Sequence, residues 1–123
     1  MAMKVITRKA HGVMDYAVST LLIASPWLFN FADGGAETII PIVLGVLAIV
    51  YSLGTAYEMG LLKVIPFKIH LLLDIMFGLF LIVSPFVFRF DEQVLWPHLI
   101  FGLLAITVVL MTERQPMAEV AKT

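Results

Sequence analysis

Two histidine–aspartate pairs carry the side chains of this sequence that are best suited to proton or ion chemistry. His11 precedes Asp15 by four residues, and His70 precedes Asp74 by the same spacing. Residues four apart share one face of an α-helix, so each imidazole lies near its carboxylate if both segments are helical. Histidine titrates near neutral pH, and a neighbouring carboxylate favours its charged form. The four side chains therefore form a candidate polar site, either a structural clasp or a proton relay.

The two paired histidines also allow a cofactor hypothesis. On facing helices at one depth, His11 and His70 are able to hold a haem or a metal ion if their rings face each other with room between them. His98 is a third imidazole, but it follows Trp96 and Pro97 at the start of another expected helix, where we interpret it as an interfacial residue. The sequence by itself assigns no metal ion and no cofactor.

Four long stretches that are almost free of charge must position these side chains. Soluble domains are about 45–50% apolar and about 25% charged, whereas this chain of 123 residues is 61% hydrophobic and 14% charged. A bilayer core of about 30 Å needs about 20 apolar residues in a helix. The sequence predicts one all-α domain over residues 1–123, a four-helix membrane bundle with helices at about 11–31, 38–58, 68–90 and 94–113.

Charge and cysteine content exclude several classes of function. The net charge is −1, which argues against a nucleic-acid partner, because phosphate binding needs a basic face. The absence of cysteine excludes disulfides, thiolate metal sites and thiol redox chemistry. No phosphate-binding glycine loop, nucleophile elbow or zinc-protease motif occurs. We therefore expect no enzyme, and we expect the lipid bilayer to be the main partner.

Basic residues gather at the two termini and in the central loop. The positions are Lys4, Arg8, Lys9, Lys63, Lys68, Arg114 and Lys122, whereas the other connections hold only Arg89. Short cytoplasmic loops of membrane proteins are enriched in lysine and arginine. The chain is therefore predicted to be a multi-pass inner membrane protein with both termini in the cytoplasm. Trp27 and Trp96 then lie at the outer interface, where indole rings prefer to sit.

An internal repeat relates the two halves of the chain. Residues 11–31 read HGVMDYAVSTLLIASPWLFNF and residues 70–90 read HLLLDIMFGLFLIVSPFVFRF, at an offset of 59 without a gap. Eight of these 21 positions are identical, among them the histidines, the aspartates and a Ser-Pro pair. The second and fourth helices match more weakly at an offset of 57, with Thr55 beside Thr112. Two copies of a two-helix unit enter from the same side, so a pseudo-twofold axis along the membrane normal is expected.

The matched segments carry a family signature. The repeats span about 11–58 and 70–114, and their motif positions are Ser25, Pro26 and Trp27 in the first copy and Ser84, Pro85 and Phe86 in the second. The pattern His-x-x-x-Asp, followed ten residues on by Ser-Pro-Trp and further aromatics, resembles the SPW-repeat family of prokaryotic membrane proteins. The resemblance implies paired membrane helices in each repeat, and it implies no established reaction or ligand.

Pro26 and Pro85 lie late in their expected helices. Each proline removes a hydrogen bond to the carbonyl four residues earlier, at Leu22 and Leu81, and the serine before each proline is able to satisfy freed backbone groups. We expect a kink or an early helix end that steers the chain into the outer turn. The aromatic residues around these motifs are interpreted as lipid anchors at the outer boundary: Trp27, Phe29, Phe31, Phe86, Phe88 and Phe90.

Small residues in the second helix leave two interpretations open. Ala48, Ser52 and Ala56 recur at four-residue spacing, which lets helices approach closely. The contact is either packing within the monomer or the seam of a homo-oligomer.

The leading hypothesis for function is a small structural or interaction protein of the membrane, without catalysis. A proton-coupled channel or transporter that uses the two His–Asp pairs is the first alternative, and a haem-binding redox protein is the second. The region between Ser19 and the outer turn offers few polar groups, which weighs against a continuous water path.

Overall fold

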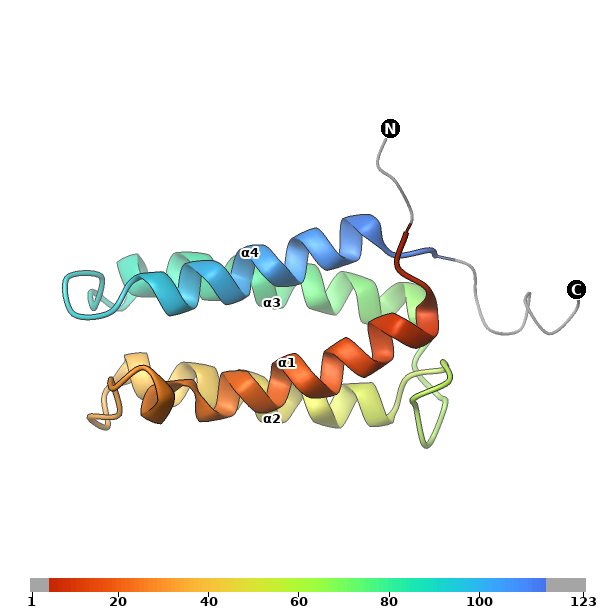
Figure 1. The fold of residues 1–123 in the computed structure, drawn as a ribbon, viewed down its shortest axis with the longest axis horizontal. Helices are drawn as coiled ribbons and strands as arrows, with labels where there is room; N and C mark the ends of the chain where they lie inside the picture. The colour runs from red at the N-terminus through yellow and green to blue at the C-terminus, as the bar shows by residue number, and fades with distance from the viewer. Residues whose placement is uncertain (1–4, 115–123) are drawn as a thin grey trace, which may run out of the picture.

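Four α-helices run side by side along the long axis of the molecule, as Figure 1 shows for the computed structural model, which describes residues 5–114. The helices are α1 (Arg8–Leu28), α2 (Ala36–Leu53), α3 (Phe67–Val87) and α4 (Trp96–Met111). Among the described residues no strand forms, although two isolated β-bridges close one end of the bundle. The predicted all-α, four-helix fold is thus confirmed.

The helix boundaries differ from the predicted ones for local reasons. α1 begins at Arg8 rather than His11, because the Thr7 side chain accepts a hydrogen bond from the Ala10 amide at 3.0 Å and caps the helix. α2 ends at Leu53, about five residues before the predicted end. There Gly54 caps the helix, and Thr55 pairs with a backbone segment instead of extending the last turn.

α1 and α3 both end two residues beyond their prolines in the same turn. Asn30 has a φ of 59°, and the Phe31 amide donates to the Pro26 carbonyl at 2.7 Å. In α3, Arg89 has a φ of 59°, and the Phe90 amide donates to Pro85 at 2.8 Å. A left-handed residue followed by this six-to-one bond is the Schellman termination of a helix. Each Ser-Pro motif therefore lies in the last turn before the chain reverses.

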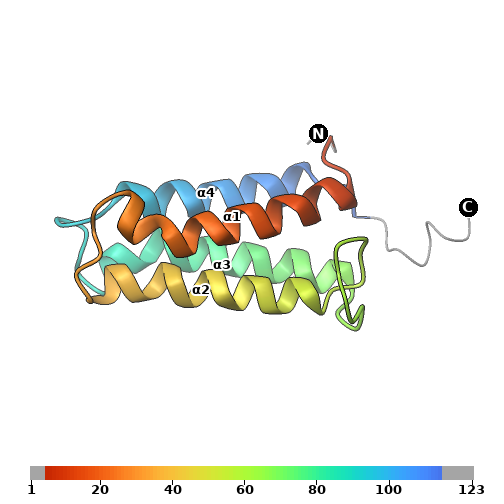
Figure 2. The ribbon, with the colours of Figure 1, turned by 60° about the horizontal axis from the view of Figure 1, so that its bottom comes forward.

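Two tight helical hairpins build the bundle. α1 packs on α2, and α3 packs on α4, whereas the two hairpins contact each other less (Figures 1 and 2). Glycine makes the close approach between α3 and α4 possible. A methyl group on Gly78 would lie 2.7 Å from the Gly102 carbonyl oxygen, and one on Gly102 would lie 2.6 Å from that of Gly78. In the other hairpin, Gly45 approaches the Ser19 carbonyl in the same way.

Apolar side chains cover the outside of the bundle as well as its interior. The outer surfaces of the helices carry large apolar residues such as Leu47, Leu72 and Leu103, each about half exposed. Large exposed apolar surfaces mark contact with a membrane or a partner. Two helices, α2 and α3, are long and apolar enough to cross a membrane by length and composition. α4 is apolar but has only 16 residues, and α1 carries three charged residues. Of the four predicted spans, therefore, two helices among the described residues are long and apolar enough to cross a membrane.

Candidate functional site

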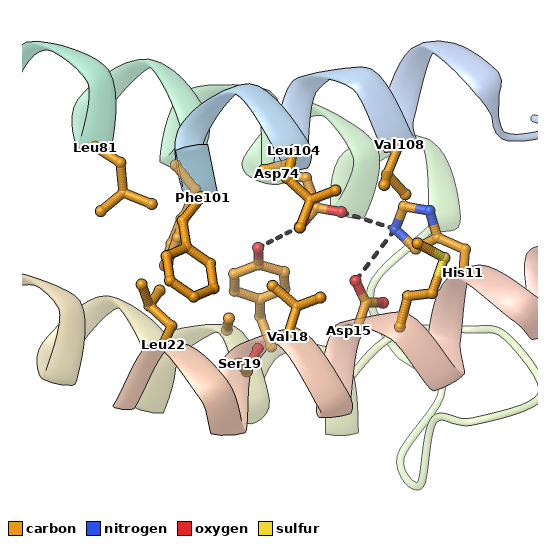
Figure 3. Close-up of a pocket in the computed structure, with 15 residues that line it drawn as sticks. His11, Asp15, Val18, Ser19, Leu22, Asp74, Leu81, Phe101, Leu104 and Val108 are labelled. Carbon is orange, nitrogen blue, oxygen red and sulfur yellow. Dashed lines mark hydrogen bonds and ion pairs between the residues drawn. The ribbon is translucent and has the colours of Figure 1, made fainter. Parts of the chain in front are cut away.

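The four residues of the predicted polar site meet between α1 and α3. His11 and Asp15 come from α1, and His70 and Asp74 come from α3 (Figure 3 labels His11, Asp15 and Asp74). One ligand atom from each side chain lies within 4.8 Å of the others. Both imidazoles are buried, and the carboxylates of Asp15 and Asp74 are only 12% and 11% exposed. We call this group the His–Asp quartet.

The shorter contacts in the quartet cross from one helix to the other. His11 Nε2 lies 2.8 Å from Asp74 Oδ2, and His70 Nε2 lies 2.9 Å from Asp15 Oδ2. The contacts within each helix, four residues apart, are 3.2 Å in both copies. Each histidine therefore faces both carboxylates and lies nearer to the one on the other helix. Four-residue spacing alone permits pairing within a helix or between helices, and the pairs between helices are the shorter ones.

A threonine anchors the other nitrogen of each histidine. His11 Nδ1 lies 2.9 Å from Thr112 Oγ1, and His70 Nδ1 lies 2.8 Å from Thr55 Oγ1. Both threonine hydroxyls already donate to the carbonyl four residues earlier, at 2.5 Å to Val108 for Thr112 and at 2.7 Å to Tyr51 for Thr55. Each threonine oxygen therefore accepts from Nδ1–H, which fixes one proton on Nδ1 and turns Nε2 toward the carboxylates.

A tyrosine hydroxyl anchors each carboxylate. The Tyr51 hydroxyl donates to Asp74 Oδ1, and the Tyr57 hydroxyl donates to Asp15 Oδ2 at 2.7 Å. Tyr57 lies in the loop after α2, where burial and then the charge of Asp15 raise the pKa of its phenol, so the hydroxyl keeps the proton that it donates. All four side chains of the quartet thus have a partner outside the quartet.

Charge balance follows from these hydrogen bonds. His11 Nδ1 donates to Thr112, and with Asp74 ionised its Nε2 also donates, to Asp74 Oδ2, which makes the ring an imidazolium. His70 Nδ1 likewise donates to Thr55, whereas its Nε2 lies near both carboxylates without an aligned hydrogen bond. Two imidazoliums beside two carboxylates sum to zero charge, which is the condition under which ionised groups tolerate burial.

The backbone around the quartet repeats its contacts in the two halves. Ile6 forms a β-bridge with Thr112, and Ile65 forms one with Thr55. The bridges place the residues before α1 beside the end of α4, and the residues before α3 beside the end of α2. Arg8 adds a bidentate ion pair to Glu58, at 2.8 Å from Nε to Oε1 and 2.9 Å from Nη2 to Oε2. These contacts close the end of the bundle next to the quartet.

A cavity of about 70 Å³ leads from the quartet along the interior of the bundle, and side chains from all four helices line it (Figure 3). At one end it reaches His11, Asp15 and Asp74, and farther along apolar side chains line it, including Leu22 and Leu81. The cavity has space for a few waters beside the polar groups. Its far end meets an apolar cluster of Leu22, Ile40, Leu81 and Phe90.

The Ser-Pro motifs lie at the opposite end from the quartet. Ser25 Oγ donates to the Leu22 carbonyl at 2.7 Å, and Ser84 Oγ donates to Leu81 at 2.9 Å. These are the carbonyls that Pro26 and Pro85 leave without an amide donor, so each serine hydroxyl satisfies a freed backbone group. Trp27 and Phe86 in the same motifs are 63% and 57% exposed and point away from the core.

The interpretation of His98 and of two phenylalanines needs correction. His98 is buried rather than interfacial, and its Nε2 donates to the Glu37 carbonyl at 3.1 Å. Phe31 and Phe90 are also buried, with ring centroids 5.5 Å and 4.8 Å from the His98 ring. The Schellman turns after α1 and α3 bring both rings inward over His98, whereas the other four aromatics of the set stay on the surface: Trp27, Phe29, Phe86 and Phe88.

The small residues of α2 face the interior of the chain. Ala48 lines the cavity, Ser52 is buried, and Ala56 lies beyond the end of the helix. Ala48 and Ser52 are therefore used in packing within the monomer.

The spacing of the histidines does not suit a haem. A bis-histidine haem holds one ring on each face of the porphyrin, so the rings are separated by the macrocycle. Here the His11 and His70 rings are in edge contact, with centroids 5.4 Å apart. The geometry therefore gives no support to the haem alternative.

The hydroxyl partners are the part of the site that sequence reasoning missed. The match of Thr55 with Thr112 at an offset of 57 is a usable signal, because each threonine follows the second helix of its hairpin and contacts the histidine of the other repeat. The tyrosines give no such signal, since Val108 stands where Tyr51 would recur.

The fold and the site together define a small all-α, membrane-associated protein with a buried ionic quartet between two helical hairpins. The sequence model of the SPW repeat domain matches residues 9–112. The chain therefore belongs to the SPW repeat family, as the Ser-Pro-Trp motif indicates. No curated protein and no solved structure matches the chain significantly.

Proposed function

We propose that this chain is a non-catalytic, multi-pass protein of the cytoplasmic membrane, whose two hairpins the His–Asp quartet clamps together. The observation that carries the proposal is the crossed pairing, in which His11 contacts Asp74 and His70 contacts Asp15. Each pair joins one hairpin to the other.

Packing makes this clamp important. Contacts between the hairpins are sparse compared with those within each hairpin, and a cavity lined by all four helices lies between the two hairpins. In a bilayer the hydrophobic effect does little to hold helices together, so close packing and polar contacts must do so. The quartet supplies such contacts at one end, and the apolar cluster that includes Leu22 and Leu81 supplies packing nearer the other end.

The proposal includes an orientation with the quartet near the cytoplasm. Arg8, Lys63 and Lys68 lie at or beyond the quartet end of the helices, and Trp27 and Trp96 lie at the other end. Lys4 and Lys122, which also enter the sequence argument, lie outside the described residues. The charge bias supports a cytoplasmic position for this end.

A proton-coupled channel remains a less supported alternative. The quartet holds ionisable groups and adjoins a cavity, as a relay requires. However, the cavity leads into the apolar cluster around Leu22 and Phe90 rather than to a polar exit. A homo-oligomer also remains a prediction, although Ala48 and Ser52 are occupied inside the monomer.

The experiment that tests the clamp is a double-mutant cycle across the hairpins. The variants His11→Gln, Asp74→Asn and their combination are purified in detergent, and the free energy of unfolding is measured for each. Removing one partner of a buried ion pair destabilises by about 3–5 kcal/mol. If the residues act as a pair, the double variant loses much less than the sum of the single losses.

A further inference from the structure

We propose that the His–Asp quartet is a binding site for a divalent first-row transition metal ion of the Zn²⁺ type. The ligands are His11 Nε2, His70 Nε2 and one oxygen each from Asp15 and Asp74. The inference deepens the proposed clamp, because it uses the same four side chains, and a metal ion would join the two hairpins through them.

The donor atoms already surround one point. Zn²⁺ sites are tetrahedral with bonds of about 2.0–2.1 Å, which places ligand atoms about 3.4 Å apart. In the quartet, each histidine Nε2 lies 2.8 to 3.2 Å from an oxygen of both carboxylates. The two rings face different oxygens of Asp15 and the same oxygen of Asp74, and one donor atom from each side chain lies within 4.8 Å of the others. A tetrahedral ligand set therefore requires the most widely spaced donor atoms to approach each other by up to about 1.4 Å, which rotations of the four side chains supply.

The partners outside the quartet have the arrangement of a metal site. Ligating histidines usually donate their second ring N–H to a fixed acceptor, and ligating carboxylates are themselves hydrogen-bonded. Here Thr112 and Thr55 accept from the two Nδ1 atoms. Tyr51 and Tyr57 donate to the carboxylates of Asp74 and Asp15. Both histidines thus keep the Nδ1 proton on a threonine, so Nε2 is the nitrogen that a metal would bind.

His70 provides an independent observation. Its side chain is fully buried, yet Nε2 has no hydrogen-bond partner with suitable geometry among the described residues. Asp15 and Asp74 oxygens lie 2.9 and 3.2 Å away, but off the direction of the N–H. A buried polar atom without an aligned partner is unfavourable by about 1–3 kcal/mol. Nε2 of His70 therefore points into the centre of the quartet, where a metal ion would satisfy it.

Charge and donor type select the ion. Two carboxylates and two neutral imidazoles around a divalent cation sum to zero charge, so the bound site suits its burial. In that state the metal takes the place of the Nε2 protons, because a ligating histidine is neutral. Two imidazole ligands favour Zn²⁺, Co²⁺ or Fe²⁺ over Mg²⁺ and Ca²⁺, which prefer all-oxygen sites. The cavity beside His11, Asp15 and Asp74 provides the approach.

The test is Co²⁺ titration of the whole chain, purified in detergent without a histidine tag and stripped of metal with a chelator. Tetrahedral Co²⁺ absorbs visible light, so the spectrum reports both binding and geometry. We expect one Co²⁺ per chain with the intense bands of a tetrahedral site, displaced by stoichiometric Zn²⁺. Zn²⁺ alone should also raise the midpoint of thermal unfolding. A chain that binds no Co²⁺ at about 1 mM, a level that corresponds to only ~4 kcal/mol of binding, overturns the proposal.

Variants assign the binding to the quartet. His70→Gln should abolish the tetrahedral spectrum, and Thr55→Val, which keeps all four ligands, should weaken Co²⁺ binding by about 10–100-fold. His98→Gln is the matched control, since it removes the other buried imidazole at the far end of the bundle. Equal Co²⁺ binding by wild type, His70→Gln and Thr55→Val contradicts the assignment, and Thr55→Val decides the question if His70→Gln does not fold.

The metal site and the clamp fail separately. Energetic coupling of His11 with Asp74 in metal-free protein, without Co²⁺ binding, leaves the clamp intact and refutes the metal site. Tetrahedral Co²⁺ binding without such coupling in metal-free protein supports the metal site and refutes the clamp as an ion-pair device.

Discussion

Arg8 and Glu58 form an ion pair that connects the start of α1 to the loop after α2. The Arg8 guanidinium is buried, and its two hydrogen bonds hold the pKa of the Glu58 carboxyl below its usual range. Because the pKa of Glu58 is lower in the folded state, the carboxylate adds stability above its unfolded pKa of about 4.3. That contribution is lost as the pH falls through the folded pKa.

The first prediction concerns this pair. Glu58→Gln should lower the free energy of unfolding at pH 7 by about 1 kcal/mol or less, because Glu58 is partly exposed. The difference from wild type should stay constant down to about pH 5 and then shrink as the pH falls through the lowered folded pKa of Glu58. Chemical unfolding in detergent at several pH values measures it, with Glu92→Gln in the opposite turn as control. A difference that persists at pH 3 would show that packing, not charge, explains the effect.

The residue scale also shows how far the site can be predicted. His–Asp spacing and its recurrence indicate the four members of the quartet, because both features are local in sequence. The crossed pairing is not predictable, since it depends on how two helices 59 residues apart are rotated toward each other. The anchors Tyr51 and Tyr57 are also hidden, because they reach the carboxylates from α2 and its following loop.

Glycine contacts govern packing at the element scale. Gly78 and Gly102 place backbone against backbone between α3 and α4, where neither carbonyl is able to move aside without shifting a helix. Close helix approach through small residues is a main source of stability between membrane helices.

Gly102→Leu should therefore destabilise the protein by about 1–3 kcal/mol or more, because the added side chain overlaps the Gly78 carbonyl. Leu103→Ala is the control on the same helix, since Leu103 is 56% exposed on the outer surface and should change stability little. The free energy of unfolding in detergent is the measurement. Equal stability of the Gly102→Leu variant and wild type would show that the two helices are not packed as described.

Helix ends show why element boundaries are harder to predict than elements. Residues 38–58 contain no charge before Glu58, so hydropathy extends the second helix through them. The chain instead leaves the helix at Gly54, because Gly54 and Ala56 hydrogen-bond to the segment around Ile65. Phe31 and Phe90 are buried rather than at the lipid boundary for a related reason. The turns after α1 and α3 carry the two rings inward to His98. Both outcomes depend on contacts distant in sequence.

The proposed orientation in the membrane concerns the whole molecule and is testable by cysteine labelling. The chain contains no cysteine, so single cysteines report the sides of the membrane without background. The Gln93→Cys variant places a thiol in the turn before α4, and Leu62→Cys places one in the loop before α3, both at exposed positions. An impermeant maleimide added to intact cells should label the first variant and spare the second. Labelling of position 62 alone would reverse the proposed orientation.

Composition predicts the architecture of the whole molecule better than its details. Four apolar stretches indicate four helices, because a helix satisfies all backbone hydrogen bonds within its own segment where no water is available. The number of full spans is less predictable, since α4 is shorter than the apolar stretch that contains it, and α1 includes the charged residues of the quartet end. The short hairpin connections follow from the glycine and polar turns in the sequence.

The most direct test of the central claim compares crossed with in-helix coupling around His11. Two double-mutant cycles in metal-free protein combine His11→Gln with Asp74→Asn and with Asp15→Asn, and unfolding free energies are measured in one detergent. We predict a coupling of about 1–3 kcal/mol between His11 and Asp74 across the hairpins, larger than the coupling between His11 and Asp15 within α1. Coupling to Asp15 alone, with none to Asp74, would contradict the claim that the quartet clamps the two hairpins together.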